Sequence, residues 1–507
     1  RNNLGDRLSL EECQQRCLDA SSCNFVVHDN RGCTSHRTCR GRPRIVGGNT
    51  TTWEKVSSNL APEGPPVDRP EADEPSFNSP QWMMRCPTEP VMTTACMTTQ
   101  DYNAATQSVK DLISSLPQTC NIEECPVADF SGCILRMAGH DFMDFRNGQG
   151  GSDGCTDMDD ADNAGLPECL YEGEFGLGTV TINDAYVQFC DQISLADFIV
   201  IAAEAVMAHL ATPRMQQSWV RLFRNRFRYG RTTAFEGCVF SEGLLPNPEE
   251  SCDDVRRVFV NNMGLSWGEA AALMGVHSLG RAKIENSGYD GWWATPDQAR
   301  SFNNNYFIAL FNRGWCPDLN VNGCSDSDEE ANRCVKRNQW KICHDNPERP
   351  ALAHQMMLDS DMCLHFADAR GNLLQAANDD CCAWMSTISR RFTFVNAIAS
   401  DNNEWCGLQC GAPFPNSRNT YRCGAGTAQA GREFRTCCAD FFVNGNLNEC
   451  ATIVRGDPKI GGPAVEETMV FANDEGEWQA TFLNAWRTAT ENGFGGQLSN
   501  LAAACPP

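Results

Sequence analysis

The sequence predicts a mainly α-helical fold that carries a small disulfide-rich N-terminal module and a cysteine-rich insertion. Residues 194–197 and 266–269 have the form of capping boxes, in which a serine and an acidic residue three positions later satisfy free amides at a helix start. Trp478, Phe482 and Trp486 recur at helical spacing, as expected for the buried face of a helix. The third observation is the 29 cysteines, which lie all along the chain and crowd into two segments.

The first cysteine-rich segment lies at the N-terminus. Residues 1–44 contain five cysteines, and so short a segment cannot build a core without covalent cross-links. We therefore predict a separate cysteine-rich module at residues 1–48. This segment resembles a truncated PAN or apple domain, a family of protein- and sugar-binding modules.

Prolines and cysteines divide the rest of the chain. Six prolines fall among acidic and small residues between positions 57 and 80, which predicts an extended linker at residues 49–80. Residues 81–507 are predicted to form the main domain. Within it, eight cysteines between positions 381 and 450 lie in a Gly/Asn-rich stretch with little periodicity, which predicts a disulfide-held insertion at residues 380–455.

The charge of the chain argues against two classes of partner. The chain has 41 basic and 65 acidic residues and a net charge of −24, which would repel nucleic acid and anionic membranes. The most apolar stretch, residues 193–210, is interrupted by Asp197, Glu204 and His209, so it falls short of a membrane span. We therefore expect no nucleic-acid partner and no membrane span.

The cysteine usage predicts an oxidising compartment. No two cysteines form a C-x-x-C pair, which argues against zinc ribbons and thioredoxin chemistry and favours disulfide bonds. The sequon at residues 49–51 adds a glycosylation signal, so we expect a secreted, extracellular glycoprotein. The number 29 is odd, so at least one thiol is free or bridges to another chain. The start at Arg1 suggests a processed mature form or a fragment.

Two segments centred on histidines carry the chemistry. Residues 135–142, LRMAGHDF, place Arg136 and His140 four positions apart, and on a helix these residues share one face. Residues 272–282, ALMGVHSLGRA, carry His277. A single histidine is more often structural than a ligand. A site that splits peroxide, however, needs three groups together: one imidazole that binds iron, a second imidazole that moves a proton, and a fixed cation that stabilises charge on the departing oxygen. The two segments supply all three.

These segments resemble the plant-type haem peroxidase superfamily, and within it cytochrome c peroxidase and ascorbate peroxidase most closely. The resemblance covers residues 81–363 and 475–495, with the motifs in the family's order. It implies the haem peroxidase helical fold and a haem b cofactor. It also implies His140 as the acid/base that moves the proton of peroxide and Arg136 as the stabiliser of the breaking bond. Asn163, in an N-A-G-L segment, would accept a hydrogen bond from the other ring nitrogen of His140.

The resemblance continues on the opposite, proximal side of the haem. Residues 277–295, HSLGRAKIENSGYDGWWAT, follow the cytochrome c peroxidase pattern closely. This implies His277 as the ligand of the haem iron, Trp293 as the proximal tryptophan and Asp361, in MMLDSDM, as the proximal aspartate. A carboxylate hydrogen-bonded to the ligand's free N–H makes the imidazole more anionic. These three residues are the implied haem-binding set.

An acidic segment after His140 resembles a calcium site. Asp141, Gly151 and Asp153 stand in the places where secreted relatives bind a calcium ion. Cys155 replaces the expected serine ligand, and a disulfide would take it away from the metal. The alternative is that residues 157–162, DMDDAD, form a solvated acidic loop without an ion.

The predicted function is that of a secreted haem peroxidase that reduces hydrogen peroxide and oxidises small organic donors, aromatic ones among them, through a ferryl intermediate. Gly139 stands where the family has Trp or Phe, so the pocket above the iron should be roomier. The alternative is a non-catalytic extracellular structural or adhesive protein built on a peroxidase scaffold, which Gly139, the insertion and the N-terminal module favour. Retention of Arg136, His140 and Asn163 favours the enzyme. The tethered module and odd cysteine suggest contacts with an extracellular matrix or between copies of the chain.

Overall fold

The computed structural model divides the chain into two compact units, Arg1–Ser76 and Phe77–Pro507. The residues that the structure describes are 86–158, 160–173, 181–234, 243–312, 315–331, 333–342, 354–366, 376 and 462–506, with the short strands at 2–5, 25–29, 32–36, 51–54, 384–385 and 452–453. Most of the predicted insertion at 380–455 therefore lies outside the described residues. Its two described strands, β9 (Trp384–Met385) and β10 (Thr452–Ile453), pair in parallel.

The first unit contains a four-stranded antiparallel sheet with the strand order β1-β3-β2-β4. Its strands are β1 (Asn2–Gly5), β2 (Phe25–Asp29), β3 (Gly32–His36) and β4 (Thr51–Glu54). Strand β4 pairs with β2 although the sequence places it in the linker, so the sheet extends beyond residue 48. The five cysteines of this unit and its likeness to a PAN or apple domain stay predictions.

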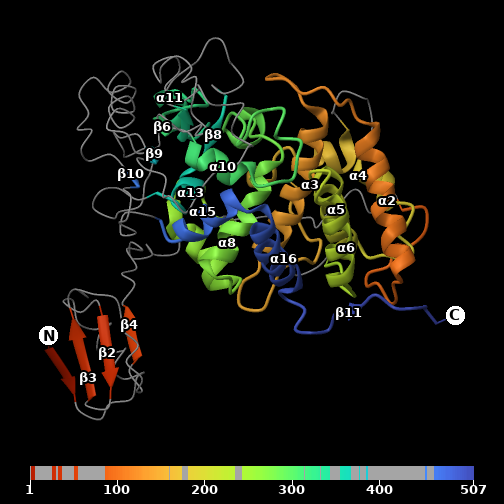
Figure 1. The fold of residues 1–507 in the computed structure, drawn as a ribbon, viewed down its shortest axis with the longest axis horizontal. Helices are drawn as coiled ribbons and strands as arrows, with labels where there is room; N and C mark the ends of the chain where they lie inside the picture. Colours follow the sequence, from red (N-terminus) through yellow and green to blue (C-terminus); the bar gives the residue numbers. More distant parts are fainter. Residues whose placement is uncertain are drawn as a thin grey trace, which may run out of the picture. The chain divides into compact units, whose positions relative to one another are not determined.

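The second unit is mainly α-helical, as predicted (Figure 1). Its α-helices are α2 (Thr99–Ser115), α3 (Pro126–Met143), α4 (Ile182–Tyr186), α5 (Leu195–Leu210), α6 (Gln216–Arg226), α7 (Ser251–Val255), α8 (Trp267–Met274), α9 (Ile284–Ser287), α10 (Asn305–Asn312), α11 (Asp326–Glu330), α13 (Asp359–Met362), α15 (Val465–Asn473) and α16 (Glu475–Glu491). Shorter turns of 3₁₀ or π helix are η2 (Ala161–Asn163), η3 (Glu168–Glu172), η4 (Arg256–Asn262) and η5 (Gly275–Ser278). The described strands here are β5 (Arg228–Tyr229), β6 (Trp315–Asp318), β7 (Gln339–Ile342), β8 (Met356–Met357) and β11 (Ser499–Asn500).

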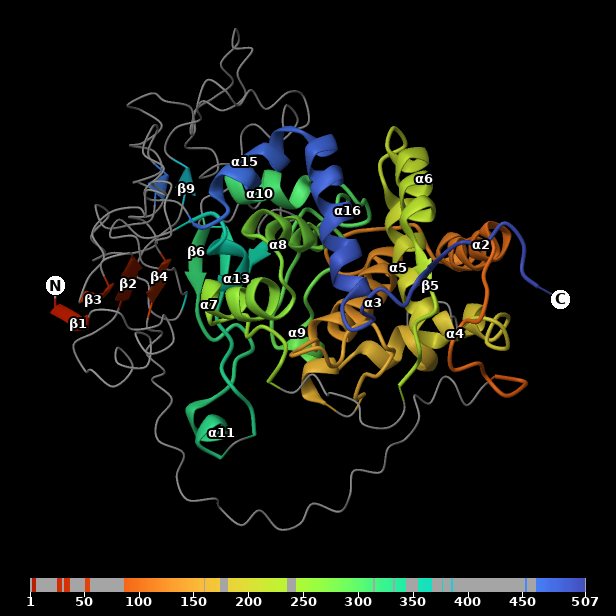
Figure 2. The same cartoon turned by 90° about the horizontal axis from the view of Figure 1, so that it is seen from below.

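Helix α5 forms the centre of one half of this unit. It packs against α2, α3 and α6, which surround it in both views (Figures 1 and 2). All its residues from Leu195 to Ala208 are buried, because the sequence LADFIVIAAEAVMA is apolar on every face except at two acidic positions. In the other half, α16 packs against α8, the helix that leads to His277. The haem-site segments thus come from both halves.

The two predicted capping boxes have different outcomes. Ser266 and Glu269 form the complete reciprocal box at the start of α8, as predicted. Ser194 caps α5 by accepting a hydrogen bond from the backbone amide of Asp197, but the Asp197 side chain does not return the bond. Its Oδ1 instead forms a buried ion pair with Arg231 at 2.8 Å, because the uncompensated guanidinium needs a carboxylate partner in the core.

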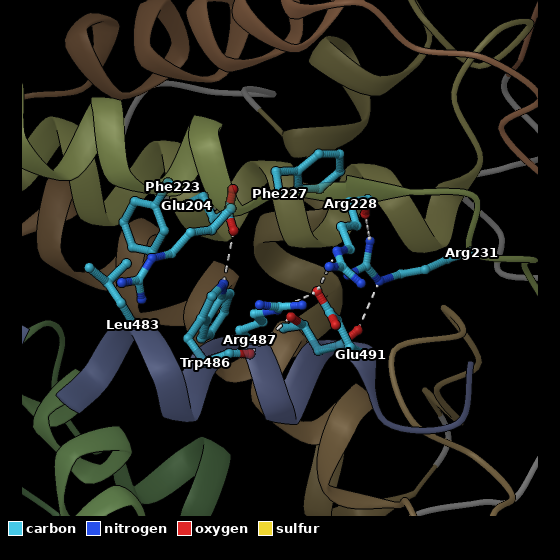
Figure 3. Close-up of a pocket in the computed structure, with 11 residues that line it drawn as sticks. Glu204, Phe223, Phe227, Arg228, Arg231, Leu483, Trp486, Arg487 and Glu491 are labelled. Atoms are coloured by element: carbon cyan, nitrogen blue, oxygen red, sulfur yellow. Dashed lines mark hydrogen bonds and ion pairs between the residues drawn. The ribbon is translucent and has the colours of Figure 1, made fainter. Parts of the chain in front are cut away.

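Helix α16 buries the predicted aromatic stripe. Trp478, Phe482 and Trp486 are all nearly or fully inaccessible to solvent, which confirms their assignment to the core. The indole Nε1 of Trp486 donates to the buried Glu204 of α5 at 3.0 Å, a contact visible in Figure 3, and Tyr102 of α2 donates to the other carboxylate oxygen at 2.6 Å. Burial raises the pKa of Glu204 to about 7. This carboxylate joins α2, α5 and α16.

Disulfide bonds staple the second unit, as the cysteine usage predicts. The described pairs are Cys86–Cys190, Cys96–Cys505, Cys120–Cys125, Cys133–Cys169, Cys252–Cys363 and Cys324–Cys334. Cys155 is also in a disulfide, so its sulfur is not free to act as a ligand. Across the described residues, no helix combines the length and the apolar character needed to cross a membrane.

Candidate active site

Helix α3 presents Arg136 and His140 one turn apart on the same face, with Gly139 between them. Pro126 occupies the first turn of this helix, where its missing amide costs nothing, and the later residues 135–138, LRMA, are strong helix formers. Both functional side chains keep partial exposure on a helix whose other face is buried. A Cβ at Gly139 would meet only the Met143 methyl, at 3.6 Å, so close packing does not require glycine at this position.

The ring of His140 is held by Asn163 in one orientation. Its Nδ1 lies 2.7 Å from the Asn163 Oδ1, and the Nδ2 of the same amide donates to the Asp157 carbonyl at 2.6 Å. The amide oxygen therefore faces the imidazole and must accept, so the proton resides on Nδ1 and the lone pair on Nε2. Burial and the charge of Arg136 lower the pKa of His140 to about 3. At neutral pH this is a neutral imidazole able to take up a proton.

Arg136 is held by the same loop that holds His140. Its Nη1 donates to the Ala164 carbonyl at 2.6 Å and its Nη2 to the Asp162 carbonyl. Burial lowers the pKa of Arg136 to about 10, so the guanidinium remains charged at neutral pH. A fixed cation thus lies beside a neutral base, because residues 162–164 provide acceptors for both side chains.

His277 lies in η5, directly after α8, and contacts both residues predicted as its proximal partners. Its Nδ1 is 2.8 Å from the Oδ1 of Asp361, and its ring stacks on Trp293 with centroids 4.2 Å apart and an 18° angle between the planes. The Trp293 Nε1 donates to the other oxygen of Asp361 at 2.8 Å. Since Nδ1 is engaged, Nε2 of His277 is the nitrogen left for a metal, and the side chain keeps 24% of its exposure.

Asp361 is the buried anion of this group. The carboxylate is fully inaccessible, and burial alone would raise its pKa, but the interaction with His277 and hydrogen bonds from Leu358 and Trp293 bring the pKa below its ordinary value. It is therefore ionised and accepts only. Its donors include one that sequence reasoning missed, the hydroxyl of Tyr306, at 2.8 Å from Oδ1. A lone aromatic hydroxyl in the apolar helix α10 is the only local signal for it.

The His140 and His277 segments are joined by a close backbone contact. A Cβ at Gly132 of α3 would lie only 2.9 Å from the Cα of Gly280, and Gly280 has a φ of +85°, which favours glycine. Beside this contact, Arg281 donates two parallel hydrogen bonds, each of 2.9 Å, to the carboxylate of Asp129. Because α3 carries His140 and Gly280 follows His277 by three residues, these contacts hold the two histidine-bearing segments against each other.

The acidic segment after His140 has two carboxylates with free oxygens. Asp141 and Asp144 are buried, and each Oδ1 accepts a backbone amide hydrogen bond, from Gly154 at 2.9 Å and from Gly151 at 2.6 Å. Among the residues that the structure describes, the Oδ2 of each has no hydrogen-bond partner. Sequence reasoning missed Asp144, although its position three residues after Asp141, directly after the end of α3, is a usable signal.

The other two predicted calcium ligands have protein partners. The Gly151 carbonyl accepts the Asp153 amide at 2.6 Å, and the Oδ1 of Asp153 accepts the Cys155 amide at 3.0 Å. Within the described ranges, no group of three or more His, Cys, Asp or Glu side chains is placed to hold a metal. The Oδ2 atoms of Asp141 and Asp144 are better placed to bind a cation than the Gly151 carbonyl and Asp153 are. Calcium at this position stays a prediction.

Known proteins that are similar to this chain include peroxidases. A family model described as "Peroxidase" matches residues 109–379, more than half of the chain. A protein of Candida albicans named "Putative heme-binding peroxidase" is 26% identical over 208 residues, which cover 40% of this chain and 65% of that protein. Mitochondrial cytochrome c peroxidase of Emericella nidulans is 26% identical over 228 residues, covering 43% and 55%. That of Cryptococcus neoformans (strain JEC21) is 36% identical over 89 residues, covering 18% and 23%.

The chain thus spans less than two thirds of the length of each of these relatives. The family model nevertheless matches a segment that contains Arg136, His140, Asn163, His277 and Asp361. The chain belongs to the peroxidase family, within the plant-type haem peroxidase superfamily.

Proposed function

We propose that this protein is a haem b peroxidase that reduces hydrogen peroxide and oxidises small organic donors, aromatic ones among them. The observation that carries the proposal is that the two imidazoles have different hydrogen-bond partners at Nδ1. His140 is neutral and has its Nδ1 tied to an amide oxygen, whereas His277 has its Nδ1 tied to a buried carboxylate. The first arrangement suits a proton carrier and the second suits an iron ligand.

The proposal places a haem between the two histidines. His277 would ligate the iron through Nε2, with Asp361 holding the ring and Trp293 stacked on it. Bound there, the haem would supply the redox chemistry. His140 Nε2 would take a proton from one oxygen of hydrogen peroxide and return it to the other oxygen. The guanidinium of Arg136 stabilises the negative charge that develops during this transfer.

The test is a visible spectrum of the haem-loaded protein, followed by mixing with hydrogen peroxide and a generic phenolic donor. We expect a Soret band, a spectral change on adding peroxide and turnover of the donor. A protein that binds haem but neither reacts with peroxide nor oxidises the donor would favour the non-catalytic structural alternative. A protein that takes up no haem would contradict the peroxidase proposal.

We further propose that calcium binds at the acidic segment with Asp141, Asp153, the Gly151 carbonyl and, in addition, Asp144. Support comes from the Oδ2 atoms of Asp141 and Asp144, which lack a hydrogen-bond partner among the described residues. It also comes from the free-energy cost of burying several carboxylates together without a cation. Burial raises the pKa of Asp144 to about 8 and that of Asp153 to about 6. Burial and the charges of Asp153 and Asp144 also raise the pKa of Asp141. A divalent cation would offset this repulsion.

Metal removal should therefore make stability depend on pH. A carboxyl whose pKa is raised on folding binds its proton more tightly in the folded state, so stability falls as pH rises from the ordinary value of 3.8 to about 8. In EDTA, Tm should decline across this range, and calcium at about 100 times its Kd should restore about 2.7 kcal/mol at pH 8. Asp144→Asn should flatten the decline in EDTA and weaken the calcium effect. An identical Tm at pH 8 with and without calcium would argue for an ion-free acidic cluster.

We also propose that the protein is secreted and that its N-terminal unit anchors it to an extracellular matrix or links copies together. The many disulfides support an oxidising compartment. Because the cysteine total of 29 is odd, at least one thiol is free or bridges to another chain. The full chain and a chain cut to residues 81–507 would be compared by light scattering and non-reducing electrophoresis. Association of the full chain alone is expected, and a monomeric full chain in both measurements would rule the anchoring role out.

A further inference from the structure

The Asp361 carboxylate, which holds His277, accepts hydrogen bonds from three further donors. Oδ1 of Asp361 accepts from the His277 Nδ1 and from the Tyr306 hydroxyl, both at 2.8 Å. Oδ2 accepts from the Trp293 Nε1 and the Leu358 amide, also at 2.8 Å. Two donors on each oxygen use the hydrogen-bonding capacity of an ionised carboxylate in full.

The packing around Tyr306 does not require its hydroxyl group. The side chain is fully buried, its ring meets the His277 ring edge to face at 5.7 Å, and it packs on Phe307 at 5.0 Å. A phenylalanine would fill the same space without the cost of burying a hydroxyl. An ionised carboxylate can only accept, so the Tyr306 O–H is the donor to the oxygen that holds His277.

We propose that Tyr306 is a positioning residue that weakens the pull of Asp361 on the His277 proton and thereby sets the reduction potential of the bound haem. This inference rests on the proposed haem function. A carboxylate oxygen that already accepts a phenol carries less charge for the imidazole N–H. The imidazole is then less anionic, and the reduced iron is less disfavoured than it would be with Asp361 alone.

The test is the midpoint potential of the ferric/ferrous couple in haem-loaded Tyr306→Phe. Loss of an outer partner of a metal ligand typically changes metal-site properties by about 10- to 100-fold. We expect the lower end, a tenfold shift toward the ferric form, which for one electron is about 59 mV more negative. The ferrous iron–histidine stretching frequency should rise, because a more anionic imidazole binds more strongly.

Two further variants keep the test decisive. Site-specific 3-fluorotyrosine at position 306 retains the shape and donates more strongly, so it should move the potential in the positive direction even if Tyr306→Phe folds poorly. Tyr102→Phe is the matched control, because Tyr102 is another buried tyrosine that donates to a buried carboxylate, Glu204, at 2.6 Å. It should leave the potential unchanged.

The outcomes separate this inference from the function on which it rests. Haem that binds normally with an unmoved potential in both position-306 variants would overturn the role of Tyr306 and leave the peroxidase proposal intact. An equal shift in Tyr102→Phe would also overturn it, since the effect would then come from general repacking. A wild-type protein that takes up no haem would overturn the proposed function itself.

Discussion

Replacing His277 with alanine is expected to abolish specific haem binding. The change removes the ring whose Nδ1 is tied to Asp361 and whose Nε2 is left for a metal. Asp361 would then be a fully buried carboxylate that has lost one of its hydrogen-bond donors, so some loss of stability is also expected. The purified variant should show no Soret band, or a weak and shifted one from loosely held haem.

The measurement is haem titration followed by absorbance, with circular dichroism to verify folding. His209→Ala is the matched control, because His209 lies at the end of α5, where its ring contacts Ser114. It should bind one equivalent of haem like the wild type. Added imidazole should partly restore the Soret band of His277→Ala by occupying the vacated ligand position. An unaltered Soret band in His277→Ala without imidazole would assign the iron to another ligand.

Replacing His140 with leucine should slow the reaction with peroxide by about 10²- to 10⁴-fold, the usual contribution of a positioned acid/base. Leucine is similar in size but has no nitrogen, so haem binding through His277 should be unaffected. The rate is read from the spectral change after rapid mixing with peroxide. In the wild type this rate should be flat between pH 4 and 7, because a pKa of about 3 keeps His140 neutral there. The rate should fall as the pH approaches that value.

Asn163→Ala provides a graded comparison for this prediction. It keeps the imidazole but removes the oxygen that fixes its tautomer, so the loss should be smaller, about 10- to 100-fold. A rate in His140→Leu equal to that of the wild type would move the proton transfer to another group. A loss in Asn163→Ala as large as that in His140→Leu would mean that the tautomer, and not only the presence of the ring, limits the reaction.

The parts of the site that could be predicted are those written in short contiguous motifs. The spacing of Arg136 and His140 places both on one helical face, and the structure does so. The resemblance paired His140 with Asn163 and His277 with Asp361, and both pairs lie in hydrogen-bond contact. Their catalytic roles stay predictions. The mainly α fold was accessible in the same way, through capping residues and the spacing of aromatic side chains on α16.

What could not be predicted depends on contacts between distant segments. Tyr306 reaches Asp361 across 55 residues, and its position in an apolar helix does not indicate which acceptor its hydroxyl meets. Gly132 and Gly280 are unremarkable until α3 lies against the segment after His277. Asp197 had the form of a capping-box acid, but a buried Arg231 competes for the same carboxylate. In each case the contact forms only in the tertiary structure. For Asp197 it overrides the local capping pattern, and for Tyr306 and the two glycines the local sequence does not identify the partner.

The Cys96–Cys505 disulfide, which spans 409 residues, makes the second unit a covalent ring. All the histidine-site residues and the C-terminal helix α16 lie within it. A single peptide-bond cleavage anywhere in residues 97–504 would open the ring but release no fragment. The cleaved protein would keep its mass on a non-reducing gel and separate into pieces only after reduction. The part of the ring that holds residues 380–455 can therefore be nicked without detaching α16 from the helix that leads to His277.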